Sequence, residues 1–140
     1  MTPEPDCIFC KIIQGDIPSF RVFEDDTVFA FMDINPVNPG HSLVIPKHHS
    51  ANIHETPDEW VAATMRGIRR LAGAVEKTLS PHGINVLQAN GPGAAQSMFH
   101  FHMHVIPRGQ DDGLTMNWGL NPGDMDAIGK LAEEIKANLD

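Results

Sequence analysis

The spacing of apolar positions along the chain predicts a set of short strands. Between residues 20 and 46, apolar runs are separated by Asp25-Asp26 and by a turn-rich loop, NPVNPG. Such runs between turn residues are typical of β-strands. Two further runs follow the same pattern in the second half of the chain. The predicted strands are Phe20–Glu24, Thr27–Asp33, Ser42–Ile45, Ile84–Ala89 and Phe99–Pro107.

Helical periodicity appears in three other segments. Cys7–Gln14 is rich in apolar residues and stops at Gly15, which predicts a short N-terminal helix. At the start of a long helix, Thr56 is positioned to cap and Glu59 to complete a capping box. A C-terminal helix is also predicted. The expected core-facing residues are Val61, Met65, Ile68, Ala72, Val75 and Leu79 in the long helix, and Ile128, Leu131, Ile135 and Leu139 in the last one.

The order of these elements favours an α+β fold with a five-stranded antiparallel sheet. Most connections between the predicted strands are short enough for hairpins, and only the long central helix could support a parallel crossover. The length of 140 residues suits one domain, which we take to span residues 1–140. Apolar residues make up 41% of the chain and charged residues 20%, which excludes wholesale disorder.

The net charge of −8 argues against a nucleic-acid polymer as partner, because such binding depends on clustered Lys and Arg. Arg69-Arg70 is interpreted as a solvated helix face. No apolar run approaches the length of a membrane span, and the start, MTPEPDC, lacks the pattern of a signal peptide. We therefore expect a cytoplasmic protein without a membrane partner. An acidic chain can still bind one small phosphate group through backbone amides.

Three of the eight histidines, His100, His102 and His104, occupy alternate positions in one predicted strand. They would share one face of the sheet, opposite Phe101, Met103 and Val105. A solvated sheet face is one interpretation. One metal ion held by all three is another, although the outer two would lie about 13 Å apart at Cα. We favour a third, in which one terminal histidine binds a structural metal and the others handle a substrate.

The two cysteines, Cys7 and Cys10, form a C-x-x-C pair that has three interpretations. A redox pair lacks the expected preceding strand, and a disulfide does not suit a reducing compartment. Half of a zinc site fits best, with His100 and the His48-His49 pair as the source of two nitrogen ligands. A closed shell of two cysteines and two histidines makes such a zinc structural rather than catalytic.

These segments together resemble the histidine-triad (HIT) family of nucleotide-binding proteins. HFHMHVI, which starts at His100, is similar to the alternating signature of the family. The resemblance extends to the Hint branch in the segments Cys7–Pro18, Phe31–Ile34, Gly40–Lys47 and Ala94–Ser97. It implies a HIT-like fold, a homodimer, and hydrolysis or transfer at the α-phosphate of a purine nucleotide conjugate. That conjugate would be a phosphoramidate or a dinucleoside polyphosphate.

The resemblance also implies roles for individual residues. His102 would be the nucleophile, forming a nucleotidyl-histidine intermediate, while His104 and His41 would face the phosphate and the leaving group. The zinc-bearing bacterial members place their ligands at the positions of Cys7, Cys10, His49 and His100. The implied nucleotide contacts are Ser97, the backbone of Ala95 and Gln96, Asp33 for the ribose, Asn90, and Ile8, Phe9, Phe31 and Ile34 for the base.

Two positions depart from the pattern of the Hint branch. Ala89 stands where that branch usually has Asn, and Ala95 where members often have Gly. Both departures leave open an alternative function, a nucleotide-binding regulatory protein with little turnover. A zinc-dependent hydrolase is a third possibility. The segment after Arg108 resembles the family weakly, and Trp118 is a candidate contact within it.

Overall fold

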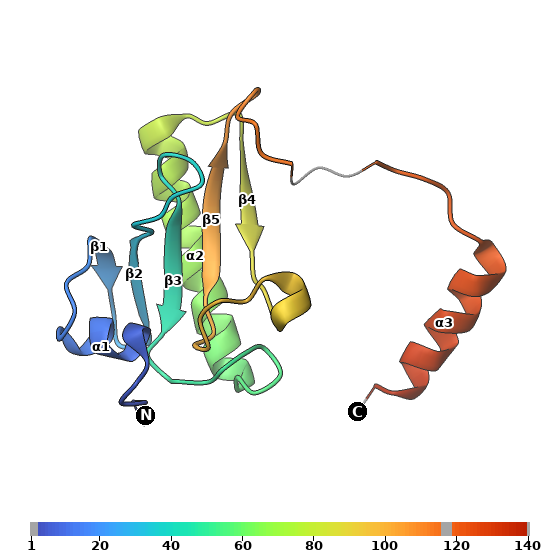
Figure 1. Ribbon diagram of the computed structural model, residues 1–140, viewed down its shortest axis with the longest axis horizontal. Helices are drawn as coiled ribbons and strands as arrows, with labels where there is room; N and C mark the ends of the chain where they lie inside the picture. The colour runs from blue at the N-terminus through green and yellow to red at the C-terminus, as the bar shows by residue number, and fades with distance from the viewer. Residues whose placement is uncertain (1–2, 116–118, 140) are drawn as a thin grey trace.

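The computed structural model describes residues 3–115 and 119–139, and it has the predicted α+β architecture (Figure 1). Within these residues, helices lie on both faces of a five-stranded sheet, so the predicted fold class is confirmed. Trp118 lies outside the described residues. In chain order the elements are α1 (Ile8–Gln14), β1 (Arg21–Glu24), β2 (Val28–Met32), β3 (Ser42–Pro46), α2 (Asp58–Leu79), β4 (Gly83–Leu87), a 3-10 turn η1 (Pro92–Ala94), β5 (Met103–Arg108) and α3 (Met125–Ala137).

The strands are arranged in the order β1-β2-β3-β5-β4, and each neighbouring pair is antiparallel. Strand β5 is inserted between β3 and β4, and it runs antiparallel to both. Strands β3 and β4 are therefore parallel to each other, and the α2 connection that joins them is the crossover that the sequence allowed. The insertion gives β5, which contains His104, a neighbouring strand on both sides.

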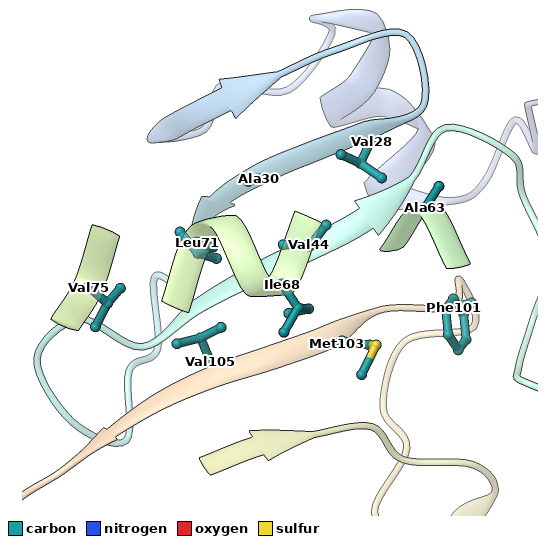
Figure 2. Close-up of a cluster of buried hydrophobic side chains, with 10 residues drawn as sticks. All are labelled: Val28, Ala30, Val44, Ala63, Ile68, Leu71, Val75, Phe101, Met103 and Val105. Carbon is teal, nitrogen blue, oxygen red and sulfur yellow. The ribbon is translucent and has the colours of Figure 1, made fainter. Parts of the chain in front are cut away.

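Alternation along the central strands produces two separate apolar clusters. Val28 and Ala30 of β2 and Val44 of β3 point to the face that α2 covers. Their neighbours Phe29 and Leu43 point to the opposite face, which α1 covers. Because every residue of β3 is buried, both faces of the sheet are packed at its centre. Figure 2 shows the cluster on the α2 side, where Ile68, Leu71 and Val75 meet Phe101, Met103 and Val105.

The predicted start of α2 was wrong in one respect. Helix α2 begins at Asp58 with Pro57 as its N-cap, and no side chain caps it. The Thr56 hydroxyl donates to the Asn52 carbonyl at 2.7 Å and pairs with the Ser50 hydroxyl at 2.7 Å. Thr56 therefore stabilises the preceding loop, and the first turn of α2 relies on its acidic residues Asp58 and Glu59.

The core-facing stripe of α2 is also rotated from the prediction. Ile68 and Val75 are buried as expected, but Met65 and Leu79 are about half exposed. Small residues take their place in the contact with the sheet, because they let the helix axis approach the strands closely. The buried residues of α2 are Ala63, Thr64, Gly67, Ile68, Leu71 and Val75.

Helix α3 lies apart from the sheet and its two covering helices (Figure 1). Its N-cap is Asp124, whose carboxylate accepts hydrogen bonds from the amides of Asp126 and Ala127. None of the residues in Met125–Ala137 is buried, so the predicted apolar stripe of this helix faces solvent. Among the described residues, none of the helices is both long enough and apolar enough to span a membrane.

The close approach of α2 to the sheet leads to a prediction at Gly67. A Cβ atom there would lie 2.8 Å from Cγ1 of Val44 and 3.3 Å from Cγ2 of Val28. Gly67→Ala should therefore lower the free energy of unfolding by about 1–3 kcal/mol despite its better helix propensity. Gly73→Ala, on the open side of the same helix, should raise it by about 0.5–1 kcal/mol. Urea denaturation of both variants measures the difference, and equal effects would contradict this packing.

Candidate active site and metal centre

A pocket of about 480 Å³ opens on the α1 side of the sheet. One wall comes from α1 and the segment after it, another from β2 and the following turn, and the floor from the histidine segment. This pocket brings together eight of the residues predicted to bind a nucleotide. They are Ile8, Phe9, Phe31, Asp33, Ile34, Ser97, His102 and His104.

The histidine segment is less regular than the sequence predicted, because Phe99 and His100 form a bend. Strand β5 begins at Met103, so His100 and His102 precede it. The alternation nevertheless holds, because Phe101 and Met103 are buried in the cluster under α2. The backbone N–H of Phe101 donates to the Ser50 carbonyl at 2.7 Å, which replaces the expected ladder bond. The histidines are consequently left on the opposite face, as predicted.

His102 is held in one tautomer by the backbone. Its Nδ1 lies 2.7 Å from the carbonyl oxygen of His100, and only a protonated Nδ1 can donate to that oxygen. Nε2 therefore has a free lone pair when the ring is neutral. Burial lowers the pKa of His102, although the hydrogen bond to His100 and the nearby Asp33 carboxylate oppose this effect. A neutral imidazole with one free nitrogen is a competent nucleophile near neutral pH.

His104 and His41 form a second ordered pair. Nδ1 of His41 accepts the N–H of Val37 at 3.2 Å, so neutral His41 has its proton on Nε2. This Nε2 lies 2.8 Å from Nδ1 of His104 and donates to it. Neutral His104 therefore has its own proton on Nε2. His104 lines the pocket, whereas His41 is buried behind it, so His41 acts on a bound ligand through His104.

Burial and mutual repulsion disfavour the charged forms of this pair. Burial, with smaller contributions from His102 and His41, lowers the pKa of His104 to about 4. Burial also lowers the pKa of His41, against the opposite effect of Asp33. The Asp33 carboxylate lies 3.4 Å from Nε2 of His41. An anion bound in the pocket would act in the same direction as Asp33 and favour a proton on the pair.

The loop that faces the histidines is held by a buried glutamine. The Gln96 side chain accepts the N–H of Gly91 and donates to the carbonyls of Ala51 and Met98. The backbone N–H groups of Ala95 and Gln96 are also occupied, because they donate to the carbonyls of Pro92 and Gly91 at 3.1 Å each. Neither residue lines the pocket, so of this predicted phosphate-binding segment only Ser97 reaches it. Ala95 adopts the left-handed conformation, with φ of 60°. This conformation explains why glycine is favourable at that position.

Asn90 does not line the pocket. Its side-chain oxygen accepts from the N–H of Ile53 and from the Gln88 amide, and its own amide donates to Gln88. These contacts tie the loop around Ile53 to the end of β4. The sequence suggested a nucleotide contact here because the family has an asparagine one position earlier.

Cys7, Cys10, His49 and His100 converge at one place, as the sequence predicted. Sγ of Cys7 lies 3.4 Å from Nδ1 of His100, and Sγ of Cys10 lies 3.4 Å from Nδ1 of His49 and 3.6 Å from that of His100. The two Nδ1 atoms are 3.2 Å apart. In a regular tetrahedral zinc site, sulfur and nitrogen ligands are about 3.5 Å apart and two nitrogens about 3.3 Å. The four donors therefore fit such an ion.

The outer contacts of this cluster suit metal binding too. Nε2 of His100 donates to the Pro46 carbonyl at 2.8 Å, which leaves Nδ1 unprotonated and free to bind a cation. The N–H of Cys10 donates to Sγ of Cys7. His48, the neighbour of His49, is not part of the cluster. Its ring instead stacks on the Trp60 ring, with 5.4 Å between the ring centroids.

Asp33, His41 and His104 also bring three potential ligand atoms together. Coordination through Nε2 of His41 would require a proton on its Nδ1. That proton would then face the N–H of Val37, one donor against another. The hydrogen bonds of these residues therefore favour an internal network over a second metal site.

Comparisons with known proteins agree with this geometry. A family model described as the HIT domain matches residues 14–111, which is well over half of the chain. This chain belongs to the HIT family. It is 44% identical over 135 residues to adenosine 5'-monophosphoramidase HNT1 of Saccharomyces cerevisiae, which covers 96% of this chain and 83% of that protein.

Two solved HIT structures extend the likeness to three dimensions. A HIT family protein from Bacillus subtilis has a TM-score of 0.90 and 41% identity, with 96% of this chain and 98% of that one covered. A structure described as a Zn-bound histidine triad family protein, from Mycobacterium smegmatis, has a TM-score of 0.75 and 35% identity. It covers 95% of this chain and 98% of that one.

The sequence of this HIT protein did not predict the backbone groups that hydrogen-bond to the histidine rings and fix their tautomers. The Val37 N–H and the Pro46 carbonyl set the protonated nitrogen of His41 and His100, and both are backbone groups. No side-chain pattern signals such contacts. Ile17 and Met98 also line the pocket, and their apolar character alone did not distinguish them from core residues.

The lowered pKa of His104 predicts that acid destabilises this HIT protein. An unfolded histidine has a pKa of about 6.5. Between that value and the folded value of about 4, the unfolded chain binds more protons, so the free energy of unfolding falls as the pH drops. His104→Asn should reduce the dependence of the free energy of unfolding on pH by at most about 1.4 kcal/mol per pH unit. The reduction is smaller where solvent reaches the ring and stabilises its charged form.

Urea denaturation at several pH values measures that slope. His82→Asn, at an exposed position, controls for the loss of a histidine as such. Identical slopes in wild type and His104→Asn would show that burial of His104 does not contribute to acid sensitivity.

The backbone of Ala95 gives a prediction about stability. A left-handed conformation costs a residue with a side chain roughly 1–2 kcal/mol, part of which glycine loses again through its freer unfolded state. Ala95→Gly should therefore raise the free energy of unfolding by about 0.5–1 kcal/mol and the melting temperature by about 2–4 °C. Ala94→Gly, within the adjacent 3-10 turn, should lower both. A lower melting temperature for Ala95→Gly would contradict this assignment.

Proposed function

We propose that this HIT protein is a nucleotide phosphoramidase, which cleaves a P–N or P–O bond at the α-phosphate of a purine nucleotide conjugate. The observation that carries the proposal is the free Nε2 of His102, fixed by the 2.7 Å bond from Nδ1 to the His100 carbonyl, in a pocket large enough for a nucleotide. HNT1, at 44% identity, is named an adenosine 5'-monophosphoramidase.

In the first step, Nε2 of His102 attacks the α-phosphorus and the bond to the leaving nitrogen or oxygen breaks. The product is a nucleotidyl group on His102. The leaving group needs a proton, which the His41–His104 pair supplies from its protonated form. The bound phosphate and Asp33 favour that form, and His104 passes the proton on because it lines the pocket.

In the second step, water attacks the same phosphorus and the bond to Nε2 of His102 breaks. The water loses its proton to the neutral His41–His104 pair, which restores the starting state. Overall, one water is consumed and a nucleoside monophosphate is released, together with a free amine from a phosphoramidate or a phosphate-terminated nucleotide from a dinucleoside polyphosphate. Dividing the hydrolysis into two displacements replaces one step with a high barrier by two steps with lower barriers.

The remaining pocket residues bind the nucleotide. Ser97, which lines the pocket, holds the phosphate, and the second oxygen of Asp33 accepts from a ribose hydroxyl. Oδ1 of Asp33 accepts from the Asn35 N–H at 2.7 Å, which orients the carboxylate. The base lies in the apolar part of the pocket, formed by Ile8, Phe9, Phe31 and Ile34.

We further propose that Cys7, Cys10, His49 and His100 bind a structural zinc ion, which places the chain with the zinc-bearing bacterial proteins of the Hint branch. The Zn-bound M. smegmatis structure supports this. Two free thiols as ligands suit a reducing compartment, such as the cytoplasm. We also propose a homodimer, since the edge strand β4 exposes Val86 and Leu87.

Adenosine 5'-phosphoramidate tests the proposal. Wild-type protein should release AMP, and intact mass measured soon after mixing should show an added adenylyl group. His102→Ala should lose the adduct and about 10⁴-fold or more in turnover, because no group replaces the nucleophile. His54→Ala, at an exposed position, should behave like wild type. Tight AMP binding with no turnover would favour the regulatory alternative instead.

A further inference from the structure

Helix α1 serves both the metal site and the pocket. Cys7 is its N-cap and Cys10 lies in its first turn, and both sulfurs belong to the metal cluster. The two residues between them, Ile8 and Phe9, line the pocket. With seven residues, α1 is too short to be stable without tertiary support. Its position therefore depends on the packing of Phe9 and Ile12 against the sheet and on what holds Cys7 and Cys10 together.

The Phe9 ring touches residues of both sites. It meets His100 edge to face at 5.9 Å between ring centroids, and His102 at 5.2 Å with an interplanar angle of 88°. It also meets Phe31, across the pocket wall, at 5.5 Å. One buried side chain thus contacts a metal-binding residue, the proposed nucleophile and the proposed base-binding surface.

His100 makes a second link between the sites. Its side chain offers Nδ1 to the metal cluster and donates from Nε2 to the Pro46 carbonyl. Its backbone carbonyl accepts the Nδ1–H of His102. The position of the His100 ring is therefore tied to the group that sets the tautomer of His102.

We propose that metal binding at the four-residue cluster and nucleotide binding in the pocket are thermodynamically coupled, with Phe9 as the positioning residue that joins them. The proposal rests on the proposed function, because it takes the pocket to be a nucleotide site. A bound ion fixes Cys7 and Cys10, and with them the wall formed by Ile8 and Phe9. When this wall is already ordered, less conformational entropy is lost as the nucleotide binds, and the affinity for the nucleotide is higher.

Linkage requires that the coupling be reciprocal. If zinc raises the affinity for AMP by some factor, AMP must raise the affinity for zinc by the same factor. Couplings between neighbouring sites typically amount to about 5–150-fold, and we expect about tenfold here. A metal that only stabilised the fold, in a protein that stays folded without it, would give a factor of one.

The experiment measures both the effect of zinc on the affinity for AMP and the effect of AMP on the affinity for zinc. The dissociation constant of AMP is determined by calorimetry for the zinc-loaded and the chelated protein, after circular dichroism has shown that the chelated protein is folded. The dissociation constant of zinc is determined by competition with a chelator, with and without saturating AMP. The two factors should agree and lie near ten.

Two substitutions within α1 test whether Phe9 transmits the coupling between the metal cluster and the pocket. Phe9→Leu keeps an apolar side chain but removes the ring contacts with His100 and His102, and should reduce the coupling to less than about threefold. Ile13→Leu is the matched control, because Ile13 packs against the cluster under α1 but does not line this pocket. It should keep the wild-type coupling.

Cobalt(II) provides a measurement that does not need a folded metal-free protein. In the cobalt-loaded protein, AMP should change the visible ligand-field absorption of the metal in wild type and in Ile13→Leu. The change should be clearly smaller in Phe9→Leu at saturating AMP. This readout applies if chelation unfolds the chain.

The possible results separate the two proposals. AMP binding with equal affinity in the presence and absence of zinc, or an unchanged cobalt spectrum in wild type, would overturn the coupling and leave the nucleotide site intact. No AMP binding in any metal state would overturn the proposed function, and the coupling with it. Wild-type coupling in Phe9→Leu would remove Phe9 from the path.

Discussion

The alternation of side chains from His100 to His104 is the constraint on which both the core and the site depend. Its odd-numbered residues, Phe101 and Met103, fill the cluster under α2, and the histidines occupy the other face. A shift by one residue would bury imidazoles among aliphatic side chains and expose a phenylalanine. The packing of the core therefore fixes the register, and the positions of the histidines follow from that register.

Burial then decides the chemistry of these rings. Each of His41, His102 and His104 is more easily deprotonated than in water, because the charged ring loses solvation. A neutral imidazole has one donor and one acceptor, so a single hydrogen bond determines which nitrogen is free. The His100 carbonyl sets this for His102, and the Val37 N–H sets it for His41. The backbone thus assigns different roles to chemically identical side chains.

Much of this arrangement could be predicted from the sequence, because it depends on local patterns. The strands, the alternation of the histidines and the C-x-x-C pair are all visible within a few residues. The failures have a common physical cause, which is competition from distant partners. Thr56 bonds to Asn52 rather than capping α2, and Gly67 replaces Met65 in the core because the sheet approaches there. The bond between His41 and His104 spans 63 positions and has no local signal.

The pairing of β3 with β5 explains how one pair of strands positions both the His41–His104 pair and the metal cluster. Leu43 lies opposite His104 in this antiparallel pair, so His41, which immediately precedes β3, is a diagonal neighbour of His104 on the same face. The chain of β3 then runs toward His100, where the Pro46 carbonyl meets its ring and His49 reaches the cysteines. The catalytic pair and the metal cluster therefore lie toward opposite ends of this pair of strands. His102 lies between them, with the pocket on one side and a fixed cluster on the other. Since both ends belong to the same pair of strands, neither site can move without displacing the core between them.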